Sequence, residues 1–419
     1  MKRLLFFAVT VFIASILTAE VWVGKLKISQ TGELPLELTV TRQDGIYLCS
    51  PAQSPAQIPS KTLYKSEDSL SLSFFSIGAK LQLKRESPTT LCGTLHQGGY
   101  SFPIQFIPKP AKDSAPKAYT EKEITIHNGS VVLSGTLTLP REMKPDAPLA
   151  IMVTGSGKQN RDEEIFGHKP FADIAAYLAE RGIATYRYDD RGSYRSTAGL
   201  PEDETTKGYA TDALAALREM RSLGITSGPT GIIGHSEGGT IAWMLPETDF
   251  VVSLAGPTVR GDSILMYQAG QIAGVSEAEM HARRRLLQAV VDGEEVTDSL
   301  VHEVDPENIT EAAALAKTLN SSRWLREFVC YSPSSDINAL NRRNIPVLAL
   351  FFEKDMQVPS MLNLPTLQRL APNFTVTVIE GVNHLLLECE DGSPLLYSTL
   401  TGTTSDKVLQ AIGDFILQL

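Results

Sequence analysis

A serine that could act as a nucleophile stands in the stretch GIIGHSEGGT, which runs from Gly231 to Thr240. Ser236 lies between Gly234 and Gly238 at the Gly-x-Ser-x-Gly spacing, which also arises by chance, so its neighbourhood has to decide. An apolar strand pattern precedes it and a helix pattern follows it. A strand-to-helix turn of this kind holds a serine in a strained conformation at the top of a sheet, and the glycines avoid collisions across the turn. The stretch therefore predicts a nucleophile at Ser236.

A nucleophilic serine needs a base that takes its proton. On such a turn the partners follow in the order serine, acid, histidine, and His281, His302 and His384 come after Ser236. His281 stands in a charged helical pattern and His302 in an acidic stretch, whereas His384 follows the last strand pattern, in EGVNHLL. A loop there could bring the imidazole beside Ser236. We expect His384 to be the general base.

An acid must orient that imidazole and stabilise its charged form. Asp355 ends the preceding strand pattern, in FFEKDMQVP, and Glu353 is expected to lie back on the strand. Asp355 is therefore the predicted acid, with a solvated carboxylate in a turn as the alternative.

The negative charge that develops on a carbonyl oxygen needs backbone donors, which form an oxyanion hole. One donor is expected from Glu237, the residue after the nucleophile, and the second from Ser156 or Gly157, in the loop after IMVTGSG. That loop does not fit a phosphate cradle. Lys158 is not followed by Ser or Thr, and Asn160 stands where a dinucleotide fingerprint has its third glycine.

The elements that must position these residues alternate between strand and helix from Glu121 onward. Strand patterns lie in EITIHNGSVVLSGTLTLP (a hairpin), APLAIMVTGSG, IATYRYDDRG, TGIIGHS, DFVVSLAGP, NIPVLALFFEKD and FTVTVIEGVNH, and helix patterns in PFADIAAYLAERG, YATDALAALREMRSLG and SDKVLQAIGDFILQL. This alternation predicts an α/β fold with a doubly wound, mostly parallel sheet over 121–419.

The alternation stops between about Arg260 and Ser335, where the pattern is mostly helical. Ser276 and Glu279 have the spacing of a capping box there. Residues 260–335 are therefore expected to form a helical cap, because insertions at the carboxyl edge of such a sheet usually cover the ligand site.

Residues 20–108 have a different pattern, in which short alternating strands are separated by Asp-Gly and Gly-Gly turns. They predict a small all-β domain, either a sandwich or a barrel, and residues 109–120 suit a linker because they are rich in Pro, Ala and Lys. Aromatic residues such as Trp22, Tyr47 and Tyr100 raise the alternative of a carbohydrate- or surface-binding module. Packing within the domain, or docking against the region 121–419, is the favoured interpretation.

The first 19 residues predict a secretory signal. The basic Met1-Lys2-Arg3 precedes an apolar run up to Ala19 that is short for a bilayer span. We expect cleavage after Ala19 and a secreted or periplasmic protein, with an uncleaved anchor as the alternative. No other stretch is long enough to span a bilayer, so stable membrane insertion after signal removal is not expected.

Charge and cysteine content limit the partners. A net charge of -10 argues against a nucleic-acid binder, which would need a basic face.

The four cysteines could pair as Cys49 with Cys92 and Cys330 with Cys389, or remain thiols. Neither Cys-x-x-Cys nor His-Glu-x-x-His occurs, so no metal or cofactor is expected. The oligomeric state is left open.

Together these residues resemble the α/β-hydrolase superfamily, and more closely exported bacterial serine esterases with an N-terminal β domain. The similarity covers nearly everything from Glu121 onward. It is carried by GSGKQNRDEE, YDDRGSYRST, GHSEGG and PVLALFFEKDMQVP, with a weaker match in IPSKTLY and LCGTLHQGGYSFPI. The resemblance implies that Ser236, Asp355 and His384 form the catalytic triad.

The sequence departs from the family pattern at positions that bear on the pocket. Lys158 stands where proline is frequent, Asn160 where aspartate is frequent, and Phe351 and Phe352 where smaller residues are frequent. These changes leave the triad intact and are expected to affect the shape and polarity of the pocket.

Several residues are candidates for binding substrate or for bracing the site. Arg161, with the two acidic residues after it, could line the pocket, although bracing is favoured. Asp190 and Arg191 are expected to hold a turn together as an ion pair. Trp324 and Phe328, in RWLREFVCY, could form a pocket wall, with packing inside the cap as the alternative.

The expected function is hydrolysis of small carboxylic esters through an acyl-enzyme intermediate. A peptidase, amidase or thioesterase could use the same triad. Exopeptidases of this fold usually add a carboxylate-lined amine site and often a propeller, for which the N-terminal β region is too short. The acyl and alcohol groups are not fixed by the sequence.

Overall fold

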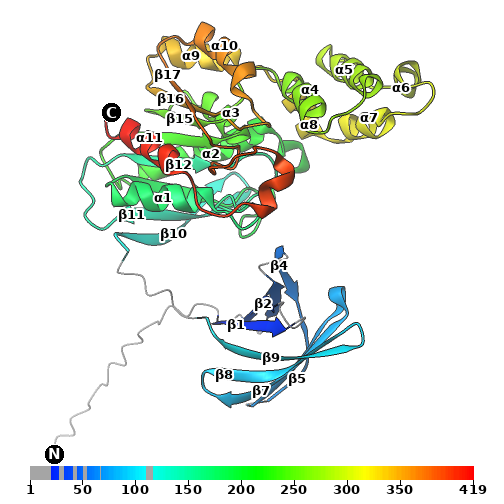
Figure 1. Ribbon diagram of the computed structural model, residues 1–419. Coiled ribbons are helices and arrows are strands. Elements are labelled where there is room, and N and C mark those ends of the chain that lie inside the picture. Colours follow the sequence, from blue (N-terminus) through cyan, green and yellow to red (C-terminus); the bar gives the residue numbers. More distant parts are fainter. Residues whose placement is uncertain (1–19, 28–32, 41–44, 51–53, 67, 110–116) are drawn as a thin grey trace, which may run out of the picture. The chain divides into compact units, whose positions relative to one another are not determined.

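The computed structural model describes residues 20–27, 33–40, 45–50, 54–66, 68–109 and 117–419. The chain divides between residues 115 and 116 into two compact units. The first contains a nine-stranded sheet and the second an eight-stranded sheet with helices (Figure 1). Within the described ranges, no helix has the length and apolar character needed to cross a bilayer. The predicted signal, residues 1–19, lies outside these ranges.

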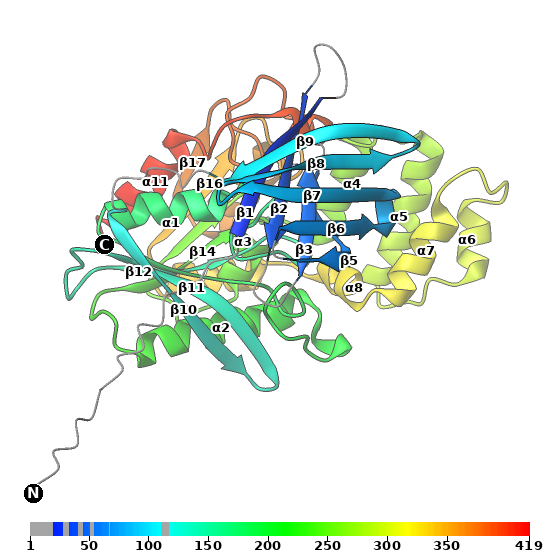
Figure 2. The same cartoon turned by 90° about the horizontal axis from the view of Figure 1, so that it is seen from below.

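The first unit is an antiparallel sheet whose strands follow one another in the order β4-β3-β2-β1-β9-β8-β7-β6-β5 (Figure 2). The strands are β1 (Glu20–Lys27), β2 (Glu33–Val40), β3 (Ile46–Ser50), β4 (Ser54–Pro59), β5 (Lys61–Lys65), β6 (Ser69–Phe74), β7 (Ala79–Ser87), β8 (Thr90–Gln97) and β9 (Tyr100–Pro108). β4 and β5 form the two edges, yet Ser60 alone separates them in the chain. The sheet therefore curls back on itself into a nearly closed barrel.

The interior of this barrel is apolar and follows the period of two that the sequence predicts. Ala79, Leu81 and Leu83 alternate with exposed residues along β7, and a short 3₁₀ helix, η1 (Phe75–Ile77), connects β6 to β7. Trp22 is 5% exposed and belongs to this core. Trp22 therefore packs within the barrel and is not available on its surface for a binding module.

The second unit has a sheet with the strand order β10-β11-β13-β12-β14-β15-β16-β17. The strands are β10 (Tyr119–Asn128), β11 (Val131–Pro140), β12 (Leu149–Val153), β13 (Ala184–Tyr188), β14 (Thr230–His235), β15 (Val251–Leu254), β16 (Val347–Phe352) and β17 (Thr375–Ile379). The β10–β11 hairpin pairs antiparallel with β13, and all strands from β13 to β17 are parallel. The predicted α/β fold with a mostly parallel sheet is confirmed.

Helices cover both faces of this sheet. One face packs against α1 (Pro170–Glu180) and α11 (Asp406–Ile416), and the other against α2 (Thr206–Ser222), α3 (Glu237–Trp243), α9 (Ser334–Arg342) and α10 (Ser360–Leu370). α1 shows why the sequence folds this way. Pro170 starts the helix, Phe171, Ile174 and Leu178 place their side chains on its buried face, and Gly182 follows its end at a φ of 86°.

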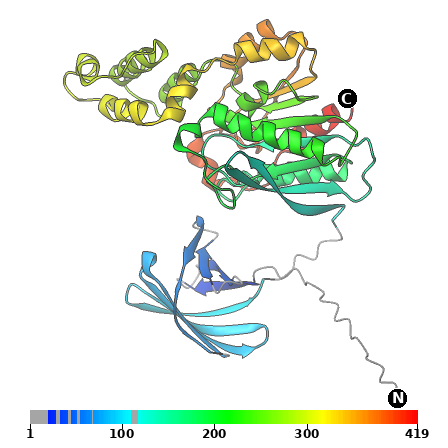
Figure 3. The ribbon, with the colours of Figure 1, turned by 180° about the vertical axis from the view of Figure 1, so that it is seen from behind.

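The remaining helices form a cap, which Figure 3 shows grouped beside the sheet. They are α4 (Gly261–Gln271), α5 (Glu277–Val291), α6 (Asp298–Val304), α7 (Ala312–Ser321) and α8 (Arg323–Cys330), and they share an apolar core. Ser276 Oγ accepts from the N–H of Glu279, 3.2 Å away, at the start of α5. The helices lie inside the interval 260–335 that the sequence marks, whereas α9 begins within it but packs on the sheet.

The cysteines form no disulfide. Cys92, Cys330 and Cys389 are thiols, so neither the Cys49–Cys92 nor the Cys330–Cys389 bridge exists. Cys330 lies at the end of α8, where its Sγ is 3.3 Å from the carbonyl of Val290.

Candidate active site

Ser236 is the single residue between β14 and α3. Its φ of 52° and ψ of −116° are strained for a residue with a side chain, and its N–H donates to the carbonyl of Leu254 on the next strand at 2.8 Å. A Cβ on Gly234 would approach the carbonyl of Gly238 to 2.0 Å, and one on Gly238 would approach that of Val153 equally closely. The glycines are therefore required by the turn, as the motif predicts.

Asp355 and His384 form a hydrogen-bonded pair. His384 Nδ1 donates to Asp355 Oδ2 over 2.7 Å, and the other carboxylate oxygen accepts from the N–H groups of Gln357 and Val358 at 2.7 and 2.8 Å. Burial alone would raise the pKa of Asp355, but His384 and the two N–H groups hold it below its usual value. The carboxylate is thus kept charged and fixes the ring so that Nε2 is the free nitrogen.

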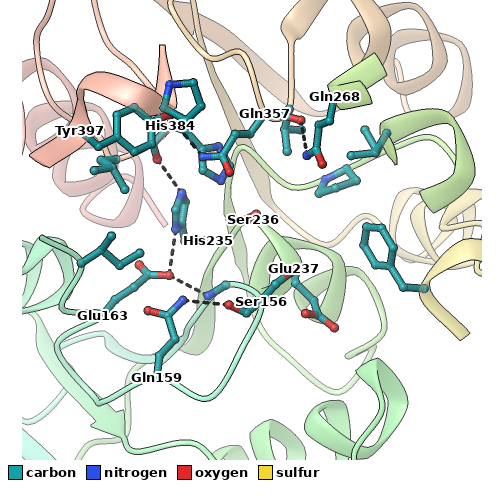
Figure 4. Close-up of a pocket in the computed structure, with 18 of the residues that line it drawn as sticks. Ser156, Gln159, Glu163, His235, Ser236, Glu237, Gln268, Gln357, His384 and Tyr397 are labelled. Carbon is teal, nitrogen blue, oxygen red and sulfur yellow. Dashed lines mark hydrogen bonds and ion pairs between the residues drawn. The ribbon is translucent and has the colours of Figure 1, made fainter. Parts of the chain in front are cut away.

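Ser236 and His384 line one cavity of about 430 Å³ at the carboxyl edge of the sheet (Figure 4). Ser156 and Glu237 line it too, whereas Gly157 lines a smaller neighbouring cavity. Among the described residues, none accepts a hydrogen bond from the N–H of Ser156 or Glu237. Of the two residues predicted for the second oxyanion donor, Ser156 is therefore the one that faces the cavity.

A buried pair of Glu163 and His235 connects three parts of the site. Glu163 is one of the two acidic residues after Arg161 that the sequence offers for lining or bracing the site, whereas His235 was not singled out. His235 Nδ1 donates to Glu163 Oε1 at 2.9 Å, and Nε2 donates to the carbonyl of His384 at 2.9 Å (Figure 4). Glu163 Oε1 also accepts from the N–H of Gly155 at 2.7 Å. The pair thus joins the loop of Ser156, the turn of Ser236 and the loop of His384.

The surroundings favour the charged form of His235. Both of its ring nitrogens donate, which requires the imidazolium. Burial alone would lower the pKa of His235, but the Glu163 carboxylate more than offsets this and raises the pKa above its usual value. Glu163 Oε2 is buried and has no hydrogen-bond partner within the described part of the chain.

The side chain of Glu237 is also buried at the cavity wall. Its Oε1 accepts from Thr206 Oγ1 at 2.6 Å and from Trp324 Nε1 at 2.8 Å. Burial raises the pKa of Glu237 more than its hydrogen bonds with Thr206, Trp324 and Ser156 lower it. Trp324 and Phe328 line the cavity with their rings stacked 5.5 Å apart, so both candidate wall residues lie where a substrate could contact them.

Arg161, the third candidate for substrate binding, does not line this cavity. Its guanidinium donates to Asp189, Glu123, Thr136 and Ser134 at 2.7–3.0 Å. These contacts tie its loop to β11 and β10, so Arg161 braces the site, which was the favoured interpretation.

The expected ion pair between Asp190 and Arg191 is wrong. Arg191 pairs with Asp212 on α2 at 2.6 Å, and both side chains are buried. Asp190 instead accepts from Thr154 Oγ1 and from the N–H of Gln159, both at 2.8 Å. Burial raises the pKa of Asp190 to about 8, more than these donors lower it.

The departures from the family pattern do not shape the cavity directly. Phe351 and Phe352 pack into the cores on opposite faces of the sheet. Lys158 pairs with Glu204 at 2.7 Å, and Asn160 Oδ1 accepts from backbone N–H groups of its own loop. The expectation that these positions alter the pocket is therefore not supported.

His235 is the residue that the sequence interpretation missed, and Glu163 was considered without its partner. His235 stands beside Ser236 inside the motif, and Glu163 lies in a dense acidic stretch near the oxyanion loop. Their pairing spans 72 residues, which no local pattern encodes. No group of three or more His, Cys, Asp or Glu side chains in the described ranges could hold a metal ion.

The chain is similar to several known proteins. A family model described as "Alpha/beta hydrolase family" matches residues 151–393. Esterase EstD of Thermotoga maritima is 27% identical over 317 residues, which cover 72% of this chain and 69% of EstD. The structure of Est1E from Butyrivibrio proteoclasticus with ferulic acid bound matches with a TM-score of 0.44 and 18% identity, over 70% of this chain and 98% of that one. The Pyrococcus furiosus esterase Pf2001 matches with a TM-score of 0.47 and 13% identity, over 74% and 96%.

Proposed function

Since the chain belongs to the alpha/beta hydrolase family, we propose that it is a serine hydrolase that cleaves carboxylic esters. The observation that carries the proposal is the 2.7 Å hydrogen bond from His384 Nδ1 to Asp355 Oδ2 in the wall of the cavity that Ser236 also lines. The similarity to esterase EstD supports esters as the substrate class.

In the proposed reaction, Ser236 Oγ attacks the ester carbonyl carbon as His384 Nε2 takes the hydroxyl proton. Asp355 stabilises the resulting imidazolium, because its own carboxylate stays charged. The C–O bond to the alcohol breaks and His384 returns the proton to the leaving oxygen. A water molecule, deprotonated by His384, then attacks the acyl-enzyme, and Ser236 leaves with the proton.

The oxyanion of each tetrahedral intermediate would accept from the N–H groups of Ser156 and Glu237. Both residues line the cavity, and neither N–H group has an acceptor in the described structure. A donor already in place costs no reorganisation during reaction, and losing one typically lowers the rate by about 10²–10³. The Glu163–His235 pair supports this arrangement by holding Gly155, the residue before Ser156.

A fluorophosphonate probe tests the nucleophile. We expect stoichiometric labelling of the wild-type protein on Ser236 and none of Ser236→Ala, with Ser227→Ala, an exposed serine, as the matched control. Labelling of Ser236→Ala at the wild-type level would overturn the mechanism. Comparing p-nitrophenyl acetate with an aminoacyl p-nitroanilide separates an esterase from a peptidase, since only a peptidase would prefer the anilide.

We also propose that residues 1–19 direct export and that Ala19 is the last residue removed. The support is the basic start followed by a short apolar run. Fractionation of cells that produce the full chain, followed by N-terminal sequencing, tests this. Glu20 is the expected first residue of an exported protein, and an intact Met1 in the cytosolic fraction alone would contradict the proposal.

A further inference from the structure

A second cavity of about 410 Å³ lies within the cap, next to the cavity that holds Ser236. The two have four lining residues in common, Leu265, Gln268, Gln357 and Pro394. Each cavity alone is within the usual size range of ligand pockets, about 300–1,000 Å³. These shared residues place the second cavity directly beside the first.

Helix α4 connects the two cavities along one of its faces. Ile264 and Leu265 line the first cavity, whereas Ala269, Ile272 and the shared Leu265 line the second. Residues 265, 268, 269 and 272 have the spacing of a single helical face. With a rise of 1.5 Å per residue, the path from Ile264 to Ile272 is about 12 Å long.

The lining of the second cavity is suited to an apolar ligand. Leu287, Leu315 and Leu325 form its other walls, together with Ile272. Arg283 is its one charged lining residue, and it forms an ion pair with Glu279 one turn earlier on α5. The charge is therefore compensated within the helix, and the cavity gains most from apolar surface that leaves water.

The polar groups at the junction are engaged with one another. Gln268 Nε2 donates to the carbonyl of Gln357 at 3.0 Å, and Gln357 Nε2 is 3.3 Å from the hydroxyl of Tyr397. These contacts give the side-chain amide nitrogens of Gln268 and Gln357 hydrogen-bonding partners at the wall of the cavities.

We propose that the second cavity is a subsite for a long, unbranched hydrocarbon chain of the substrate, which extends from Ser236 along α4. The inference rests on the proposed ester hydrolysis at Ser236 and names its substrate class. The chain could belong to the acyl or to the alcohol part of the ester, because the two have the same chemistry. Each methylene buried in the subsite is expected to raise kcat/KM by up to about fourfold.

An ester series on the intact protein tests the subsite. The acyl arm compares p-nitrophenyl acetate, octanoate and dodecanoate, and the alcohol arm compares methyl acetate with decyl acetate. Ala269→Trp fills the second cavity, and Ala278→Trp, the same change at an exposed position on α5, is the control. We expect Ala269→Trp to lower kcat/KM for the long esters of one arm by at least about tenfold relative to Ala278→Trp.

Equal activity of Ala269→Trp and Ala278→Trp on every long ester would overturn the subsite. Loss of p-nitrophenyl acetate hydrolysis and of probe labelling in the wild type would instead overturn the proposed function, so the two failures are distinguishable. If Ala269→Trp does not fold, wild-type labelling by ethyl and decyl fluorophosphonates decides the question. Faster reaction of the decyl compound supports the subsite, and equal rates contradict it.

Discussion

The interior of the N-terminal barrel and the carboxyl edge of the mixed sheet both contain buried side chains, but those side chains differ in their chemistry. In the barrel, Ser73 is the one buried polar side chain among the residues whose burial is described. At the sheet edge the buried side chains include Glu163, Asp355 and His384, and each of these has a hydrogen-bonding partner.

The buried charged side chains at the sheet edge lower the stability of the fold unless they are paired. A buried charge is strongly unfavourable unless it is paired, whereas buried apolar side chains stabilise the fold directly. Clusters of buried groups with shifted pKa values are typical of functional sites. We therefore expect substitutions at the sheet edge to affect catalysis first and substitutions in the barrel to affect stability alone.

The largest effect is expected from Asp355→Asn. The amide can still accept from the N–H groups of Gln357 and Val358, so the loop keeps its shape. It cannot stabilise the His384 imidazolium, and removal of that charge typically lowers kcat by about 10⁴. Steady-state hydrolysis of p-nitrophenyl acetate measures the loss.

Glu353→Gln is the matched control for this prediction. Glu353 is half-exposed at the end of the same strand and pairs with the N–H of Gly381 at 2.8 Å. It should change kcat by less than about twofold. A loss below tenfold in Asp355→Asn would mean that Asp355 does not orient the base.

The candidate residues of the proposed triad could be found because each lies in a recognisable single segment of the sequence. Ser236 carries the glycines of its turn, and Asp355 and His384 each follow an apolar strand pattern in the required order. The fold class could be predicted for the same reason, since periodicity is local. Helix α10 was not assigned from the sequence, and Pro365 in its interior weakens its helical signal.

The bracing contacts could not be predicted in the same way. Trp324 and Glu237 are 87 residues apart, and His235 contacts the carbonyl of a residue 149 positions later. A carbonyl acceptor has no sequence signature at all. Such contacts depend on how the cap and the loops close over the edge, which is decided by packing.

The second largest effect is expected in the barrel, from Phe106→Ala. Phe106 is fully buried in the barrel core, and removing such a side chain typically costs about 3–5 kcal/mol of unfolding free energy. Ile107→Ala, at a neighbouring position that is 45% exposed, is the control. Urea unfolding should show the loss for Phe106→Ala, while kcat per folded molecule stays unchanged. A fall in kcat would break the distinction between the two regions.

A smaller and pH-dependent effect is expected for Glu163→Gln. The pKa of His235 is raised in the folded protein by Glu163, so the pair stabilises the fold fully below the usual histidine pKa of about 6.5. This contribution disappears as the pH rises through the raised pKa and His235 loses its proton. We expect a loss of about 1–3 kcal/mol at pH 6 and a smaller one at pH 9.

Urea unfolding of wild type and Glu163→Gln at the two pH values measures this difference. Glu164→Gln is the control, because Glu164 pairs with Lys169 at 3.2 Å and not with the histidine. An equal loss at both pH values, or a larger one at pH 9, would show that His235 is not held as the imidazolium.

The smallest effect is expected for Trp324→Phe, which keeps the ring stacked on Phe328 and removes one donor from Glu237 Oε1. Thr206 still donates to that oxygen, so kcat/KM should fall by about 2–10-fold. Thr206→Val removes the other donor and should have a similar effect.

The double variant Trp324→Phe/Thr206→Val tests whether Glu237 Oε1, the acceptor that both donors share, contributes to activity. With both donors gone, a buried carboxylate oxygen loses the hydrogen bonds that compensate its burial, and the last bond removed costs more than the first. The double variant should therefore lose more than the product of the two single losses, measured as kcat/KM for p-nitrophenyl acetate. Independent effects would show that Trp324 acts through its ring, as a wall of the cavity, and that the cap does not reach the site through Glu237.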